Sequence, residues 1–222
     1  VEVEVRTPIG VQALRLYHPA DMLTLNEVFC RGDYGADEAL GTVVDFGSNI
    51  GVSAAYFLSR NTTAHVYLFE PDQRNIAKLH AQLAPFKGRY TLREVAVGLS
   101  DDAVSFCHEE TGRYGGVSSA LTQSWAATAR TTTVPCVDAE KALRAIIARH
   151  GEIDVLKVDI EGLEAKVLKH LSATTRASIR SIYAEMDGRG TELSGFRRSQ
   201  RGSIAVYRRI AHVAAAAERA TA

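Results

Sequence analysis

The sequence predicts an α/β protein with a mostly parallel sheet that is covered by helices on both faces. From residue 42 onward, short apolar runs alternate with helical stretches of about 10 residues, which is the pattern of consecutive strand–helix–strand units. The chain has 222 residues, 46% of them hydrophobic, which is enough for one domain with a sizeable core. A disordered or fibrous protein is excluded.

The first 41 residues are expected to cap the sheet. Apolar and polar residues alternate on both sides of a turn at 7–10, which predicts a short hairpin over residues 1–17. Pro19 and Asp21 are typical of a helix start, and the following apolar residues keep helical spacing until Gly32. We therefore divide the chain into an N-terminal hairpin and helix cap, residues 1–41, and a main domain, residues 42–222.

The main domain is expected to alternate strands and helices. Strands are predicted at 43–46, 65–69, 90–97, 153–158 and 179–185, and helices at 51–60, 72–83, 139–150 and 163–171. A last antiparallel strand is predicted within 202–210, followed by an alanine-rich helix or frayed end at 212–222. The polar stretch 98–132 interrupts the alternation. Its part at 109–130, rich in Gly, Ser, Thr and Ala, is expected to form a mobile loop over a site.

Composition excludes several classes of protein. Lysine plus arginine equals aspartate plus glutamate, 26 of each, so the whole molecule has no general attraction to nucleic acid or to an anionic membrane. Its cysteines, Cys30, Cys107 and Cys136, lack the spacing of a disulfide framework or zinc site, which predicts reduced thiols. No run reaches the roughly 18 apolar residues of a membrane span. We expect a cytoplasmic protein without a histidine or cysteine metal site.

A turn of small and polar residues follows the first strand of the main domain. These residues are Asp45, Gly47, Ser48, Asn49 and Gly51. Gly47 and Gly51 let the backbone pass close to a ligand, and the helix that begins there offers unpaired N–H groups. Nineteen residues after Gly51, Glu70 ends the next strand, where a carboxylate can accept hydrogen bonds from both hydroxyls of a ribose. Together, turn and acid predict a ligand that contains adenosine.

Two details favour S-adenosylmethionine over a dinucleotide as that ligand. In the fingerprint G-x-G-x-x-G the second glycine makes room for a pyrophosphate, and here Asn49 stands in that place. Asp45 would repel a phosphate but can help to hold the ammonium group of S-adenosylmethionine. The alternatives are a dinucleotide and a turn that merely joins strand to helix, which would leave Glu70 unexplained.

Four motifs resemble those of the FkbM-type methyltransferases, a branch of the class I S-adenosylmethionine-dependent enzymes. They are DFGSNIG at 45–51, FEPD at 69–72, EVAVGLSD at 94–101 and LKVDIEGLE at 156–164. The resemblance covers about residues 21–187 and is specific, because the four motifs appear in the expected order. It departs after Glu185, where residues 186–190 form only a short connection in place of the usual helix.

The resemblance implies a Rossmann-like class I methyltransferase fold, with a mostly parallel seven-stranded sheet, helices on both faces and an antiparallel last strand. In such folds Glu70, followed here by Pro71, binds the ribose, and the turn at 45–51 binds the amino-acid part of the cofactor. Residues near Ala96 and Val97 bind the adenine, and we count Asp159 among the cofactor-binding residues. The implied reaction transfers a methyl group to a hydroxyl of a sugar or another secondary metabolite.

Carboxylates after the fourth and fifth strands are the candidate catalytic residues. Asp159 and Glu161 follow the strand at 153–158, and Glu185 ends the strand at 179–185, at the edge that faces the ligand crevice of an open α/β sheet. Methyl transfer to a hydroxyl requires a positioned oxygen and help in removing its proton. One of these carboxylates can be the base, with His80 and His108 as alternatives if they are folded inward.

Other interpretations of the same acids stay open. Converging oxygen ligands could bind a divalent cation that lowers the pKa of the hydroxyl. Alternatively, Asp159 and Glu161 could only cap the following helix. Lys157 lies within the strand, where burying its charge without a partner is costly. We therefore expect it to form a structural ion pair with Asp159 or Glu185.

The acceptor and partners are less well defined by the sequence. The C-terminal stretch carries the arginines Arg189, Arg197, Arg198, Arg201, Arg208 and Arg209. They form either a solvated face or a clamp on an anionic acceptor such as a phosphorylated or carboxylated sugar, and no nucleic-acid partner is expected. Tyr114 and Trp125 could stack on a sugar ring. Residues 1–41 could pack over the site or against the second subunit of a homodimer.

From these observations we expect an O-methyltransferase that uses S-adenosylmethionine. One alternative is an N-methyltransferase, which needs less help from a base. The others are a scaffold protein that binds the cofactor without chemistry and a dehydrogenase that uses NAD(P). The fold alone does not decide between them.

Overall fold

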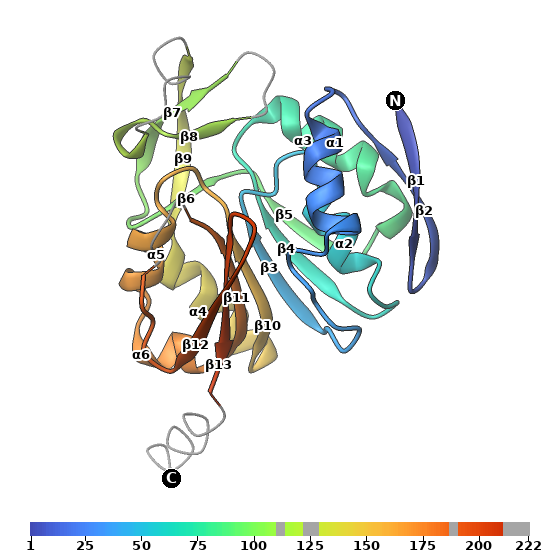
Figure 1. The fold of residues 1–222 in the computed structure, drawn as a ribbon. Coiled ribbons are helices and arrows are strands. Elements are labelled where there is room, and N and C mark those ends of the chain that lie inside the picture. The colour runs from blue at the N-terminus through green and yellow to red at the C-terminus, as the bar shows by residue number, and fades with distance from the viewer. Residues whose placement is uncertain (110–113, 122–128, 187–190, 211–222) are drawn as a thin grey trace.

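The computed structural model describes residues 1–109, 114–121, 129–186 and 191–210. Its centre is a seven-stranded sheet (Figure 1). In spatial order its strands are β12 (Phe196–Arg201), β13 (Ile204–Arg209), β11 (Ile179–Glu185), β10 (Ile153–Val158), β3 (Thr42–Phe46), β4 (His65–Phe69) and β5 (Tyr90–Arg93). Neighbours from β11 to β5 are parallel, whereas β13 is antiparallel to both β11 and β12. The sheet is therefore mixed, and β13 is the expected antiparallel last strand.

The central strands bury side chains on both faces of this sheet. Every residue of β3 and β10 is buried. Val43 and Val44 pack into different apolar clusters, because successive side chains of a strand point to opposite faces. One face is covered by α2 (Val52–Leu58) and α3 (Gln73–Gln82), and the short η2 (Ala84–Phe86) follows α3. The other face is covered by α4 (Ala139–His150), α5 (Glu164–His170) and α6 (Ala173–Ala177). The expected helices on both faces are confirmed.

The N-terminal segment packs on the side of the sheet that α2 covers. It forms the expected hairpin, β1 (Glu2–Thr7) and β2 (Gly10–Arg15), and then a helix, α1 (Asp21–Leu25), that continues as a π-helix, η1 (Asn26–Cys30). Leu14, Leu25 and Val28 belong to the same apolar cluster as Val43. The cap therefore shares a core with the sheet, and α1 lies beside α2 and α3 (Figure 1).

A second, four-stranded sheet corrects the prediction for residues 90–138. Its order is β6 (Ala96–Gly98), β9 (Arg130–Asp138), β7 (Ala103–His108) and β8 (Gly115–Val117), with the short η3 (Ser118–Ala120) after β8. The single strand expected at 90–97 is wrong, because β5 ends at Arg93 and β6 pairs with β9 instead of continuing the large sheet. The sequence of 98–132 lacks the apolar pattern by which strands are predicted, because most side chains of β7 and β9 are not buried.

The sequence patterns also failed to predict the strand β12. This edge strand reads FRRSQR and buries only its first residue, so it lacks the apolar alternation by which strands are predicted. The alanine-rich helix or frayed end expected at 212–222 lies outside the described residues, as do 110–113 and 122–128 of the expected loop. No helix in the described part of the chain combines the length and the apolar character that crossing a membrane requires.

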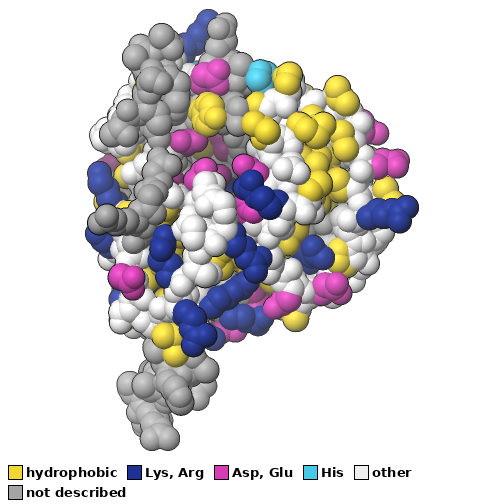
Figure 2. All heavy atoms as spheres, in the orientation of Figure 1, with side chains coloured by type: hydrophobic (Ala, Val, Ile, Leu, Met, Phe, Trp, Pro, Cys, Tyr) yellow, Lys and Arg dark blue, Asp and Glu magenta, His cyan; other side chains and the backbone are white. Residues whose placement is uncertain are grey.

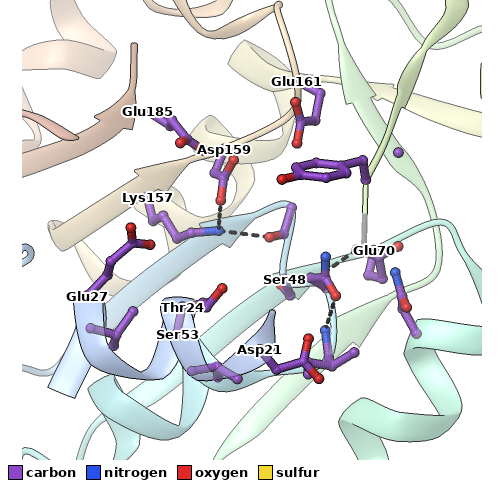
Figure 3. A pocket seen from close by; sticks show the side chains of 18 of the residues that line it. Asp21, Thr24, Glu27, Ser48, Ser53, Glu70, Lys157, Asp159, Glu161 and Glu185 are labelled. Atoms are coloured by element: carbon purple, nitrogen blue, oxygen red, sulfur yellow. Dashed lines mark hydrogen bonds and ion pairs between the residues drawn. The ribbon is translucent and has the colours of Figure 1, made fainter. Parts of the chain in front are cut away.

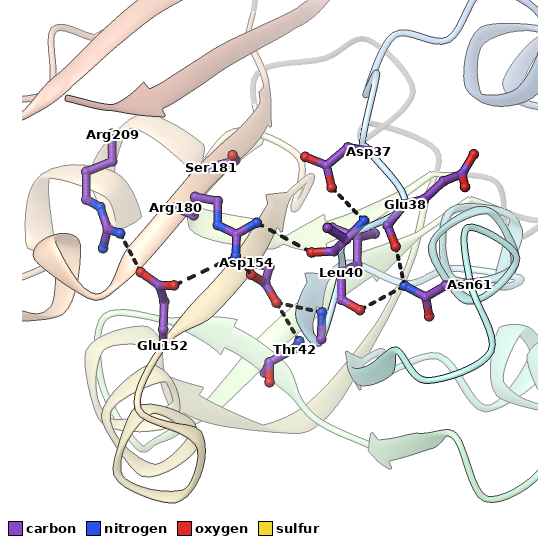
Figure 4. Close-up of polar contacts among 12 residues, drawn as sticks. Asp37, Glu38, Leu40, Thr42, Asn61, Glu152, Asp154, Arg180, Ser181 and Arg209 are labelled. Atoms are coloured by element: carbon purple, nitrogen blue, oxygen red, sulfur yellow. Dashed lines mark hydrogen bonds and ion pairs between the residues drawn. The ribbon is translucent and has the colours of Figure 1, made fainter. Parts of the chain in front are cut away.

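Polar contacts at the amino end of the sheet fix the place where β3 begins (Figure 4). The Asp154 carboxylate of β10 accepts hydrogen bonds from the backbone N–H groups of Gly41, at 2.7 Å, and Thr42, at 2.9 Å, and it pairs with Arg180 of β11. The Asn61 side chain donates to two carbonyl groups of the same linking segment. The connection between cap and sheet is thus held by side chains of three other segments.

Replacing Asp154 by alanine is expected to lower the free energy of unfolding by about 1–3 kcal/mol, because the N–H groups of Gly41 and Thr42 lose their acceptor. Urea unfolding followed by circular dichroism measures the change. The control is Glu2→Ala, which removes a solvent-exposed pair with Arg15 and is expected to cost about 0–1 kcal/mol. Equal losses in the two variants would show that Asp154 has no special role.

Candidate functional site

A cavity of about 230 Å³ opens at the carboxyl ends of β3, β10 and β11. Its wall combines the turn after β3, the ends of β10 and β11, the turn between β12 and β13, and the cap. Figure 3 shows Asp21, Thr24 and Glu27 of the cap lying across from Asp159 at the end of β10. These cap residues were not predicted as site residues, because neither their type nor their spacing forms a known motif.

The turn after β3 is tied to β4 through its backbone. The N–H groups of Gly47 and Ser48 both donate to the carbonyl oxygen of Phe69, at 3.1 Å, and the Ser48 hydroxyl accepts from the Phe69 N–H. Gly47, Asn49 and Gly51 have φ angles of 80°, 48° and 87°, in the left-handed region. Gly47, Ser48 and Asn49 line the cavity, as the sequence predicts for the ligand turn.

Gly47 and Gly51 allow close contacts with different neighbouring residues. A Cβ on Gly47 would lie 1.8 Å from the carbonyl oxygen of Asp159, so only glycine lets the turn approach the end of β10. A Cβ on Gly51 would lie 3.3 Å from the Cγ atom of Leu79, so Gly51 lets α2 begin close to α3. Gly47 therefore shapes the cavity directly, whereas Gly51 supports it through helix packing.

Glu70, at the end of β4, is a buried acid in the wall of the cavity. Its two carboxylate oxygens accept backbone hydrogen bonds from Asn49 and Asp72, each at 2.9 Å. Burial raises the pKa of Glu70 to about 7, although both hydrogen bonds oppose that shift. Each oxygen keeps a further lone pair, so the carboxylate can still accept hydrogen bonds from two hydroxyls of a ligand.

Lys157 forms the expected buried ion pair, with two acids instead of one. Its Nζ atom lies 3.0 Å from the Oδ1 of Asp45 and 3.3 Å from the Oδ2 of Asp159, and it donates to the Gly47 carbonyl at 2.8 Å. Burial lowers the pKa of Lys157, but the attraction of Asp45 and Asp159 outweighs burial and raises the pKa well above its usual value. Lys157 is thus a fixed ammonium group.

Asp45 lies behind the cavity wall. It is fully buried, and the Ser53 hydroxyl donates to its Oδ2 at 2.7 Å while Lys157 binds its Oδ1. Asp45 is therefore engaged within the protein by a hydrogen bond at Oδ2 and an ion pair at Oδ1, and it does not line the cavity. The proposal that Asp45 contacts the ammonium group of a ligand does not fit this placement, because Asp45 acts on the cavity only through Lys157.

The side chains of Glu185 and Asp159 interact at the carboxyl ends of β11 and β10. Repulsion by Asp159, followed by burial and a hydrogen bond between the two side chains, raises the pKa of Glu185 to about 9. Glu185 is therefore protonated at neutral pH and donates to Asp159, whose other neighbour is the Lys157 ammonium. Both acids line the cavity, as does Glu161, so the structure brings together all three predicted catalytic residues.

Glu161 stands on a strained turn after β10. Its φ angle is 54°, which is uncommon for a residue other than glycine. The Glu164 carboxylate holds this turn by accepting from the N–H groups of Ile160, at 2.8 Å, and Gly162, at 2.9 Å. No side chain caps the start of α5, so Asp159 and Glu161 do not have the capping role considered above, and the nearby backbone contacts belong to Glu164.

A smaller cavity of about 30 Å³ adjoins the first. Gly47, Glu70 and Asp159 line both cavities. The other lining residues of the smaller one are mostly apolar and include Pro71, Val95, Ala96, Val97, Val117 and Ile160. Glu70 is the buried acid at the mouth of this apolar slot. Pro71, Ala96 and Val97, three of the residues predicted to bind the cofactor, lie together in its wall.

The alternative bases, the metal site and the aromatic and basic candidates have different outcomes. The His80 ring contacts the Tyr90 hydroxyl, and neither His80 nor His108 lines the cavity. Within the described ranges, no group of three or more His, Cys, Asp or Glu side chains has an arrangement that could hold a metal ion. Tyr114 lines the cavity, whereas Trp125 and Arg189 lie outside the described residues.

The sequence matches the family described as "Methyltransferase FkbM domain" over residues 45–203. Among solved structures, the chain resembles the putative methyltransferase yhhF from Escherichia coli, with a TM-score of 0.51 and 16% identity over 94% of this chain and 99% of that one. The putative methylase HI0767 from Haemophilus influenzae is also similar, with a TM-score of 0.47 and 10% identity over 95% and 99% of the two chains. A search of the curated proteins found no match. At 16% identity, the first likeness shows the fold alone.

Gly47→Ala is expected to destabilise the protein more than Gly88→Ala. Both glycines have left-handed φ angles, 80° and 84°, but a Cβ on Gly88 would meet nothing within 4 Å. Gly88→Ala should therefore cost only the backbone strain, about 1–2 kcal/mol, while Gly47→Ala must also push the turn away from Asp159. Thermal unfolding of the two variants measures the difference, and similar melting temperatures would contradict the close contact at Gly47.

Proposed function

The chain belongs to the FkbM methyltransferase family, and from this premise we propose that it transfers a methyl group from S-adenosylmethionine to a hydroxyl of a small molecule. The observation that carries the proposal is the carboxyl pair of Glu185 and Asp159, which stands in the same cavity as Glu70 and the turn at Gly47. A nucleoside-binding end and an acid–base end therefore share one space. This is the arrangement that methylation of a hydroxyl requires.

The cofactor end of the proposal rests on residues already placed in the two cavities. Glu70 is positioned to accept the ribose hydroxyls, and Ala96 and Val97 form part of the apolar slot for the adenine. Lys157, fixed by Asp45, offers a positive charge near Gly47 that suits the carboxylate of the amino-acid part. When bound, S-adenosylmethionine supplies a methyl group whose bond to sulfur breaks, leaving the electron pair on sulfur, as the acceptor oxygen bonds to the carbon.

We assign the acid–base chemistry to Asp159 and Glu185. Because the raised pKa of Glu185 keeps that group protonated, we assign to its neighbour Asp159 the role of accepting the proton of an acceptor hydroxyl. Lys157 keeps Asp159 in place, and Glu185 donates to it, so its orientation is fixed before the acceptor arrives. Glu161, on its strained turn, lines the same side of the cavity and is proposed to orient the acceptor.

Titration calorimetry with S-adenosylhomocysteine tests the cofactor end. We expect Glu70→Gln to weaken binding about tenfold to a hundredfold, because a charged acceptor of two hydrogen bonds is lost. The matched control is Glu94→Gln, an acid near the site that does not line the cavity. Absence of binding by the unmodified protein, or a preference for NADH, would contradict the cofactor assignment.

Binding of S-adenosylhomocysteine should also depend on pH through Glu70. Its pKa of about 7 means that the unliganded protein must lose a proton from Glu70 below that pH before the carboxylate can bind the ribose. Affinity should therefore fall by up to about tenfold from pH 8 to pH 6, and Glu70→Gln should abolish this dependence. A dependence that survives in the variant would belong to another group.

Asp159→Asn is expected to lower kcat about a hundredfold to ten-thousandfold with a hydroxyl acceptor, because the proton acceptor is removed. Transfer is measured as formation of S-adenosylhomocysteine with sugars that bear hydroxyl groups, and Glu94→Gln again serves as the control. An N-methyltransferase would lose little activity in the same variant, since a neutral amine needs less help from a base. A loss of S-adenosylhomocysteine binding equal to the loss of rate would instead indicate a role in cofactor binding.

A further inference from the structure

Tyr34 is a buried tyrosine in the wall of the larger cavity. It follows the π-helix η1 of the cap, and only 5% of the residue is exposed. None of the sequence motifs includes it, and the proposed methyl transfer assigns it no task. A polar group that is buried beside a ligand cavity needs a hydrogen-bond partner, either from the protein or from the ligand.

Three aromatic rings hold the ring of Tyr34 in place. It stacks on Phe57 of α2, with ring centroids 5.2 Å apart and an angle of 28° between the planes. The rings of Tyr56 and Tyr183 lie against it at centroid distances of 5.9 Å and 5.4 Å, and all four residues belong to one apolar cluster. This packing restrains the ring, so the place of its hydroxyl is fixed before a ligand binds.

The Tyr34 hydroxyl is close enough to Lys157, Asp159, Asp45 and Glu185 to interact with their charges. Among the residues that the structure describes, none forms a hydrogen bond with this hydroxyl. Burial raises the pKa of Tyr34 well above its usual value; Lys157 opposes this shift, and the three acids add to it. The hydroxyl therefore keeps its proton and can donate a hydrogen bond to a ligand in the cavity.

Other donors near Lys157 are engaged within the protein. Each backbone N–H group of residues 47–51 donates to an oxygen of the protein. The Nζ atom of Lys157 has oxygens of Asp45, Asp159 and Gly47 at 3.0 Å, 3.3 Å and 2.8 Å. An anionic ligand group that is attracted by the charge of Lys157 therefore needs a hydrogen-bond donor from another part of the wall.

The charge of the cavity wall leaves one favourable place for a carboxylate. Lys157 is the sole lysine or arginine among the described residues that line the cavity, whereas several acids line it. Figure 2 shows acidic side chains near the middle of this face, with most Lys and Arg side chains below them. A carboxylate is attracted by Lys157 and repelled by the acids. We propose that the Tyr34 hydroxyl donates a hydrogen bond to the carboxylate of the amino-acid part of S-adenosylmethionine, beside Lys157, and this inference rests on the proposed function.

Two segments thus share the recognition of this carboxylate. Lys157 of β10 supplies the charge, and Tyr34 of the cap supplies a directional hydrogen bond. A hydrogen bond from a hydroxyl to a carboxylate is roughly twice as strong as one between neutral groups. Because the Tyr34 ring packs on α2, the position of the cap becomes part of the cofactor site.

The test is titration calorimetry with S-adenosylhomocysteine and with its decarboxylated form, which lacks only the carboxylate. Tyr34→Phe removes the hydroxyl and keeps the ring with its packing. We expect this variant to bind S-adenosylhomocysteine about tenfold to a hundredfold more weakly, because a hydrogen bond to a charged group is lost. Its affinity for the decarboxylated molecule should stay within about twofold of that of the unmodified protein.

Tyr183→Phe is the matched control, because it removes a hydroxyl from a ring that packs against Tyr34 and does not line the cavity. It should change neither affinity, and thermal unfolding checks that both variants are folded. If Tyr34→Phe binds S-adenosylhomocysteine normally, or loses affinity for both ligands equally, the inference is overturned and the cofactor assignment stands. If the unmodified protein binds neither ligand, the proposed function itself fails, and the inference fails with it.

Discussion

The site depends on one buried ammonium group, that of Lys157, between the two central strands. It bonds Asp45 on β3, Asp159 beyond the end of β10, and the carbonyl of Gly47 in the turn between β3 and α2. A buried lysine alone would be costly, and the buried Asp45 carboxylate would be costly without a cation, so each group is tolerable only with its partners. The turn after β3 and the carboxyl end of β10 are thereby held in one fixed relation.

The same charge balance explains why the neighbouring acids differ in protonation. Lys157 stabilises Asp159, but its influence on Glu185 is smaller than the repulsion from Asp159, so Glu185 retains a proton. At the other end of the cavity, burial keeps the pKa of Glu70 near neutrality. Three acids with similar side chains thus have different environments, which is the basis on which the proposed function assigns ribose binding to one of them and proton removal to another.

The cap completes this space from a distant part of the chain. Residues of α1 and η1 reach the cavity because the cap shares its apolar core with β3 and α2, which places Thr24 and Glu27 across from Asp159. The second sheet closes another side: Phe106 of β7 and Gly115 of β8 line both cavities. The cavity is therefore bounded by segments from the first, middle and last parts of the described chain.

The sequence by itself determined the parallel strands of the central sheet, the antiparallel last strand and the turn of small residues that precedes Glu70, because continuous apolar runs and glycines at fixed spacing are local signals. It also located Asp159, Glu161 and Glu185, since acids that follow parallel strands must meet at one edge of the sheet. Only the tertiary structure decided that Asp45 faces Lys157 instead of the cavity, and that Asp21 and Glu27 join the site. Those outcomes depend on contacts between residues far apart in sequence, and no local pattern records which neighbour a carboxylate will meet.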